Sequence, residues 1–159
     1  MTATRPPFVV ALTGPAGCGK STVARILREI APPVAAVRFA GPLKSMFHTF
    51  LTSSGVDPLD AMNMVDGHLK EVPADALGGR TPRHAMQTLG TEWGRNLIDA
   101  DLWTSAWRRS AVRVLDDGRS VVAEDCRFAN EAGLVRGLGG IVVRLTGRDG
   151  VDVGDHSSE

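Results

Sequence analysis

Residues 14–21 of this chain read Gly-Pro-Ala-Gly-Cys-Gly-Lys-Ser and match G-x-x-x-x-G-K-[ST], the phosphate-binding loop called Walker A. Glycines allow a tight turn in which successive backbone N–H groups point inward at anionic oxygens. The ammonium of Lys20 would add charge at the terminal phosphates, and the hydroxyl of Ser21 would bind Mg²⁺. The residues predicted to bind ATP in this loop are Gly14, Ala16, Gly17, Cys18, Gly19, Lys20, Ser21 and Thr22.

A Walker A loop must follow a strand and begin a helix, and both are predicted here. Residues 8–13 form a short apolar run that suits a buried strand. Residues 21–30 carry apolar side chains at helical spacing, and the start of such a helix favours a bound anion. The alternative is a glycine-rich turn that binds nothing.

The composition is that of a globular protein. The 159 residues, 43% hydrophobic and 23% charged, are enough for one domain with a substantial core. The 18 basic and 18 acidic residues cancel, which argues against a nucleic-acid partner attracted by bulk charge. No apolar run is long enough to cross a membrane, so no membrane partner is expected, and no signal-peptide core is present.

The two cysteines, Cys18 and Cys126, have neither zinc-ligand nor redox-motif spacing. Cys18 lies inside the loop, where it is expected to fill space rather than react. A reduced, cytoplasmic setting is therefore expected. The sequence leaves a homodimer open.

Strands alternate with helices along the chain, which predicts an α/β fold with a parallel sheet of at least four strands and helices on both faces. Ligands bind such sheets at the carboxyl ends of the strands. Helix N-caps are predicted at Asp57, Thr81 and Asp101. The predicted strands are residues 8–13, 34–40, 121–123 and 141–145, and the predicted helices are residues 21–30, 43–51, 59–69, 82–97, 102–114 and 130–138.

The predicted helix over residues 82–97 has two different faces. One face carries Arg83 and Gln87, followed by Gly90 and Gly94. A face without bulk would let a flat ligand approach closely. The alternative, which the spacing alone favours, is that the glycines serve helix packing. The opposite, apolar face is predicted to consist of Met86, Leu89, Trp93 and Leu97.

A carboxylate follows the third predicted strand, at the edge of the sheet where the loop is expected. An apolar strand that ends in an acid is the Walker B arrangement, whose carboxylate holds Mg²⁺ together with the hydroxyl of the loop. Asp125 is the predicted ligand beside Ser21, and Glu124 is the alternative.

Phosphoryl transfer needs positioned positive charge more than covalent chemistry, and arginine grips phosphate through two parallel N–H groups. Arg83, near a helix start, suits an acceptor phosphate. Arg127 would reach the mouth of the site, and Arg148 follows the fourth strand, where a closing lid would lie. For each arginine the alternative is a surface salt bridge. The predicted catalytic residues are Lys20, Arg83 and Arg127.

Four further segments resemble the phage-type deoxynucleoside monophosphate kinases. The distinctive one is residues 79–95, Gly-Arg-Thr-Pro-Arg-His-Ala-Met-Gln-Thr-Leu-Gly-Thr-Glu-Trp-Gly-Arg, because the Walker A loop is shared with many families. The others are residues 39–44 (Phe-Ala-Gly-Pro-Leu-Lys), residues 125–132 (Asp-Cys-Arg-Phe-Ala-Asn-Glu-Ala) and residues 156–159 (His-Ser-Ser-Glu).

The resemblance implies transfer of the γ-phosphoryl group of ATP to a deoxynucleoside monophosphate, giving the diphosphate. Arg83 would grip the monophosphate, and Lys44 would assist near the phosphates. The residues that the resemblance implies for the acceptor site are Lys44, Arg83, Gln87, Trp93 and Asp125.

The resemblance also implies a P-loop nucleoside-monophosphate-kinase-like three-layer fold in a single domain, residues 1–159. Its core would be residues 1–51 and 116–146, its acceptor-binding helical region about residues 52–115, and its lid or tail residues 147–159.

The chain departs from the family pattern in two places. Gly41 stands where the family carries an acid, and family members continue beyond the position of Glu159 into a further strand that helps hold the adenine.

Two alternatives stay open. One is a P-loop ATP-binding or switch protein without a small acceptor, which the arginines of the middle helix disfavour. The other is a kinase for a different acceptor, such as dephospho-coenzyme A or a ribonucleotide. The preferred base is not determined by the sequence.

Overall fold

The computed structural model describes residues 6–31 and 33–146. The chain divides into two compact units, and each is described here by itself. The sheet unit consists of Met1–Phe39 and Trp107–Glu159, and the helical unit is Ala40–Ala106.

The boundaries of the two units differ from those of the predicted core and helical region. Residues 40–51 belong to the helical unit rather than to the core, and residues 107–115 belong to the sheet unit rather than to the helical region. The helix α5 (Leu102–Asp116) accounts for the second difference, because it runs across the division between the units.

The described part of the sheet unit alternates strands and helices, as the sequence predicts. The strand predicted over residues 34–40 is shorter than expected, because Phe39 leaves the ladder and donates its backbone N–H to the Asp125 carboxylate, 2.9 Å away. The elements are β1 (Val9–Thr13), α1 (Lys20–Ile30), β2 (Val34–Ala36), β3 (Ser120–Ala123), α6 (Ala129–Gly137) and β4 (Ile141–Arg144).

The four strands form one parallel sheet in the order β2-β3-β1-β4, which confirms the predicted α/β class. In the register, Ala11 of β1 faces Ala123 of β3, and Thr13 faces Arg144 of β4. The segments that follow β1 and β3 therefore begin at the same edge of the sheet.

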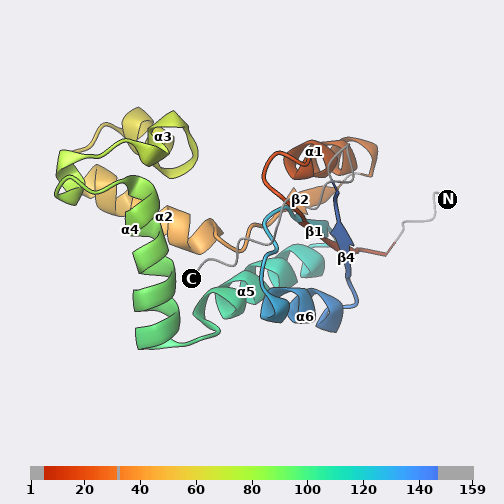
Figure 1. Ribbon diagram of the computed structural model, residues 1–159. Coiled ribbons are helices and arrows are strands. Elements are labelled where there is room, and N and C mark those ends of the chain that lie inside the picture. The colour runs from red at the N-terminus through yellow and green to blue at the C-terminus, as the bar shows by residue number, and fades with distance from the viewer. Residues whose placement is uncertain (1–5, 32, 147–159) are drawn as a thin grey trace. The chain divides into compact units, whose positions relative to one another are not determined.

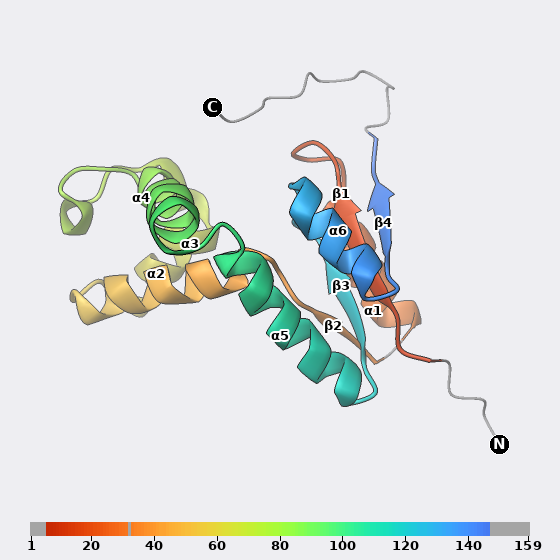
Figure 2. The same ribbon diagram turned by 90° about the horizontal axis from the view of Figure 1, so that it is seen from below.

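Alternate residues of β1 point to opposite faces of the sheet, as the pleat requires. Val9 and Ala11 lie in a core with Trp107 of α5 and Val135 of α6. Val10 and Leu12 lie in a second core with Ala24 of α1 and Val34. Helix α1 thus covers one face, and α5 and α6 cover the other (Figure 1). Figure 2, seen from below, shows α6 in front of the strands.

The helical unit has its own apolar core, formed by Leu43, Phe47, Leu51, Ala61, Val65, Met86 and Trp103. The predicted N-caps Asp57 and Thr81 are confirmed, since their side chains accept from the backbone N–H groups of Leu59 at 2.8 Å and His84 at 3.2 Å. Its elements are α2 (Gly41–Ser53), α3 (Pro58–Asp66), the short 3₁₀ helices η1 (His68–Glu71) and η2 (Asp75–Leu77), α4 (Pro82–Thr88) and the π-helical segment η3 (Leu89–Ile98).

The π-helical geometry of η3 overturns the predicted apolar stripe of the middle helix. Its hydrogen bonds run from residue i+5 to residue i, for example from Asp99 N to Gly94 O at 3.0 Å, so each turn takes more residues than in an α-helix. Positions spaced for an α-helix therefore rotate away from one face. Leu97 is 76% exposed and Trp93 38% exposed, whereas Met86 is buried as predicted.

In the part of the chain that the structure covers, we find no helix with the length and apolar character needed to cross a membrane.

Candidate active site

The loop between β1 and α1 has the backbone geometry that its glycines predict. Gly14, Gly17 and Gly19 have φ values of +140°, +78° and +94°, which side-chain-bearing residues rarely adopt. Gly14 also needs its small size, because a Cβ atom there would lie 2.3 Å from the carbonyl oxygen of Leu145. The sequence Gly14–Ser21 thus forms a strand–loop–helix turn, with α1 beginning at Lys20.

Backbone N–H groups of this loop are available to a ligand. Within the described residues, the N–H groups of Gly17, Gly19, Lys20 and Ser21 have no hydrogen-bond acceptor, and α1 has no side-chain N-cap. These donors lie at the start of an eleven-residue helix, where the helix dipole favours an anion. The loop can therefore accept the oxygens of a phosphate group.

The side chain of Lys20 turns back over the loop. Its Nζ atom donates to the carbonyl oxygens of Gly14 at 2.7 Å and Pro15 at 2.5 Å, and lies 3.6 Å from the Cys18 sulfur. The ammonium is thereby held among the loop's own groups, while Ser21 is exposed at the first turn of α1.

The two acidic residues after β3 are both engaged within the sheet unit. Glu124 forms an ion pair with Arg38, and an Asp125 carboxylate oxygen accepts from the Phe39 backbone. Asp125 is half-buried and directly follows the strand that neighbours β1, so it begins at the same sheet edge as the loop. A carboxylate and a hydroxyl are suitable Mg²⁺ ligands.

A complete protein cage for a metal is absent from residues 6–31 and 33–146, since no three His, Cys, Asp or Glu side chains there are placed to hold one. Mg²⁺ commonly uses one or two protein ligands and the phosphates of its nucleotide. Ser21 and Asp125 fit that donor set.

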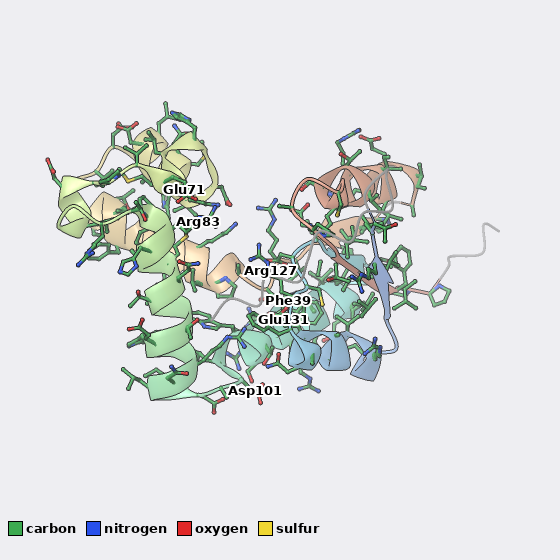
Figure 3. All side chains as sticks on the ribbon, viewed as in Figure 1. Phe39, Glu71, Arg83, Asp101, Arg127 and Glu131 are labelled. Atoms are coloured by element: carbon green, nitrogen blue, oxygen red, sulfur yellow. The ribbon has the colours of Figure 1, made fainter. Side chains whose placement is uncertain are left out.

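Arg127 has an exposed side chain and a fixed backbone. Its N–H donates to the Glu131 carboxylate at 2.7 Å, and the same oxygen accepts from Phe128 N at 3.1 Å (Figure 3). Glu131 is only 3% exposed and lies in the first turn of α6, where acids cap helix N-termini. No role was predicted for Glu131, although a glutamate at this position of a helix is the signal that would have identified its capping role.

Cys126, between Asp125 and Arg127 in the sequence, is buried. Burial, followed by the negative charges of Glu131 and Asp125, raises the pKa of its thiol to about 11. The thiol therefore stays protonated at neutral pH and is inert as a nucleophile.

Apart from Asp125, which belongs to the sheet unit, the predicted acceptor residues lie in the helical unit. Arg83, at the start of α4, forms an ion pair with Glu71 of η1 (Figure 3), and Lys44 of α2 forms one with Asp66 of α3. Gln87 is exposed and follows Arg83 by one turn, so both lie on one face of α4. Lys44, Arg83 and Gln87 thus present polar groups to solvent in this unit.

The glycines of the middle helix serve packing, which was the alternative favoured by their spacing. A Cβ atom on Gly94 would lie 2.6 Å from the Trp103 indole, and one on Gly90 would lie 2.8 Å from a Leu43 methyl group. The Trp103 indole N–H also donates to the Gly90 carbonyl at 2.8 Å. Trp93 packs against Trp103 with ring centroids 6.3 Å apart and keeps part of its surface exposed.

The predicted site residues therefore form two groups. The loop, Asp125 and Arg127 belong to the sheet unit, whereas Lys44, Arg83, Gln87 and Trp93 belong to the helical unit. Arg148, predicted for a lid, lies outside the described residues.

No family model matches this sequence, and a search among curated proteins returned no match.

Proposed function

We propose that this chain is an ATP- and Mg²⁺-dependent phosphotransferase that converts a deoxynucleoside monophosphate to its diphosphate. The observation that carries the proposal is the loop Gly14–Ser21, where backbone N–H groups have no acceptor within the described residues and the Lys20 ammonium turns back onto the loop. This arrangement suits a polyphosphate and has no obvious role in packing.

The order of the strands supports a P-loop nucleotide-kinase fold. Neighbouring strands β1 and β3 are followed by α1 and α6, which cover opposite faces of the sheet. Between two such strands the segments diverge and leave a crevice at their carboxyl ends, where open α/β sheets bind ligands. The glycine-rich loop and Asp125 both begin at that position.

In the proposed reaction the loop N–H groups bind the β- and γ-phosphates, and Lys20 moves from the carbonyl oxygens of Gly14 and Pro15 to the phosphate oxygens. Ser21 and Asp125 would hold Mg²⁺, which would supply neutralisation of the phosphate charge. Arg127 stabilises charge that develops on the transferred group. An oxygen of the acceptor phosphate forms a bond to the γ-phosphorus of ATP, the bond from that phosphorus to the β,γ-bridging oxygen breaks, and ADP leaves with the electron pair.

On the acceptor side, Arg83 binds the phosphate of the monophosphate through its planar guanidinium. Gln87, one helical turn away, and the exposed part of Trp93 contribute to the site for the nucleoside. The deoxynucleoside class itself rests on the resemblance of residues 79–95 to phage-type deoxynucleoside monophosphate kinases.

A coupled assay of ADP formation tests the proposal. The full chain is incubated with ATP and Mg²⁺, with each of the four deoxynucleoside monophosphates, the ribonucleotides and dephospho-coenzyme A added in turn. We expect at least one deoxynucleoside monophosphate to stimulate turnover. Stimulation by another acceptor alone would change the substrate class, and ATP binding without any stimulation would indicate a switch or binding protein instead.

A further inference from the structure

Two ion pairs of the helical unit connect four of its elements. Lys44 of α2 pairs with Asp66 at the end of α3, and Arg83 of α4 pairs with Glu71 of η1. The Arg83 and Glu71 side chains are 51% and 60% exposed, and the Lys44–Asp66 pair is partly exposed, at 24% and 43%. Exposed pairs of this kind contribute little net stability, so an anion can displace their carboxylates.

A third cation, Lys70, lies on η1, which packs against both α3 and α4. It precedes Glu71 in η1 and is half-buried, and its ammonium forms no ion pair or hydrogen bond within the described part of the chain. Burial, and next the positive charges of Lys44 and Arg83, lower the pKa of Lys70, while Asp66 and Glu71 act in the opposite direction. The five charged groups therefore interact electrostatically, and the cations exceed the carboxylates by one.

The distribution of lysines also points to this cluster. The chain has three lysines among its 18 basic residues. Lys20 lies in the phosphate-binding loop, and the other two, Lys44 and Lys70, both lie in this cluster. An exposed cation elsewhere on this chain is almost always arginine.

We propose that Lys70, Lys44 and Arg83 together bind a phosphate monoester dianion, and that Asp66 and Glu71 are internal counterions that the phosphate displaces. A monoester carries a charge of about −1.5 to −2 at pH 7, which three cations on neighbouring elements would neutralise better than Arg83 alone. The identification of this monoester as the acceptor substrate rests on the proposed function. Lys70 is then the residue that separates a phosphorylated acceptor from the bare nucleoside.

Lysine-selective NMR on the full chain tests this site without any activity measurement. Reductive ¹³C-methylation keeps the charge of each lysine and gives three side-chain signals, which single Lys→Gln variants assign. Titration with inorganic phosphate, at ionic strength held constant with chloride, should shift the Lys44 and Lys70 signals along one saturable curve. If the Lys70 signal does not move, or moves equally with chloride, the proposal is wrong.

The affinity of the unmethylated protein for inorganic phosphate is then compared between the wild type and single variants. K70Q should weaken phosphate binding about fivefold, as expected for the loss of one partly screened charge contact, while K70R should retain it. R109Q, which removes an exposed charge from α5, should leave the affinity unchanged. Equal loss in K70Q and R109Q would reduce the effect to net charge and overturn the site.

These results separate the two proposals. If the Lys70 signal saturates but no monophosphate stimulates ADP formation, the anion site stands and the proposed reaction fails. If a monophosphate stimulates ADP formation while K70Q retains wild-type affinity, the reaction stands and the role of Lys70 is wrong.

Discussion

The Nζ atom of Lys20 donates a hydrogen bond to the carbonyl oxygen of Gly14, 2.7 Å away, and so bridges the two ends of the glycine-rich loop. The same ammonium donates to the Pro15 carbonyl oxygen at 2.5 Å. A phosphate group would exchange carbonyl oxygens for anionic oxygens around Nζ, which is a stronger electrostatic interaction. The loop is therefore organised around a cation before any nucleotide arrives.

Replacement of this cation should remove the proposed activity. We expect K20A to lower kcat by about 100-fold or more, because preorganised charge at the transferred phosphate is lost. The coupled ADP assay measures the effect. R25A, which removes an exposed cation from α1 that pairs with Glu29 one turn away, is the control and should retain activity. A K20A enzyme within tenfold of the wild type would contradict the role of Lys20.

Substitutions of the two partners of the Arg83–Glu71 ion pair should change the KM for the monophosphate in opposite directions. R83A should raise the KM for the monophosphate about 10- to 100-fold, as loss of a charged hydrogen bond implies. E71Q should instead lower that KM by up to about fivefold, because the competing carboxylate is gone. Initial rates over a range of monophosphate concentrations measure both.

The combined variant provides the control for this pair. In the R83A background, E71Q should no longer change the KM, since the carboxylate has no guanidinium left to compete for. A raised KM in E71Q alone would show that Glu71 itself holds the acceptor.

The contact of Gly94 with Trp103 should make this glycine intolerant of substitution. G94A should destabilise the protein by about 1–3 kcal/mol, because the new methyl group overlaps the indole ring. Urea denaturation measures the change. G133A is the matched control, because a Cβ atom there meets nothing within 4 Å in α6, and it should stabilise by up to about 1 kcal/mol. Unchanged stability of G94A would contradict the packing role.

The buried thiol of Cys126 should add to the free energy of unfolding at neutral pH, and this contribution should be lost at high pH. Its pKa rises from 9.0 in the unfolded chain to about 11 in the folded protein, so the folded state keeps the proton longer. The stabilisation is full below pH 9 and is lost as the pH rises through 11.

Unfolding free energies between pH 8 and 11 measure this effect. C126A lowers stability at every pH through the lost side-chain volume, so the test is the slope of stability against pH rather than its value. We expect a shallower fall in C126A than in the wild type. Parallel slopes would mean that Cys126 does not titrate as the buried thiol described here.

Local patterns were enough to predict the elements of the sheet unit. Apolar runs identified all four strands of the described region, and the phosphate loop was predicted together with the strand and helix that flank it. Asp57 and Thr81 were identified as N-caps because a capping side chain acts within three residues of itself. The helix boundaries differ from prediction by a few residues at most in this unit.

Features that depend on contacts between residues far apart in the sequence were predicted less accurately. The apolar stripe through Leu97 was wrong because η3 is π-helical, and no local rule distinguishes that geometry from an α-helix. Lys70 was missed because its charged neighbours come from other elements, whereas Glu131 was given no role although its bonds to Arg127 and Phe128 are local. The assignment of Lys44 and Arg83 to the acceptor stays a prediction, while their ion-pair partners emerged from the structure.

The sequence by itself determined the parallel α/β class, the glycine-rich turn and the order of elements, because periodicity, capping and left-handed backbone are local properties of neighbouring residues. Only the tertiary structure decided that β1 lies between β3 and β4, that Gly94 packs on Trp103, and that Lys44, Lys70 and Arg83 share one charged cluster. These relationships join residues from separate elements, and they form only when the burial of apolar faces brings those elements together.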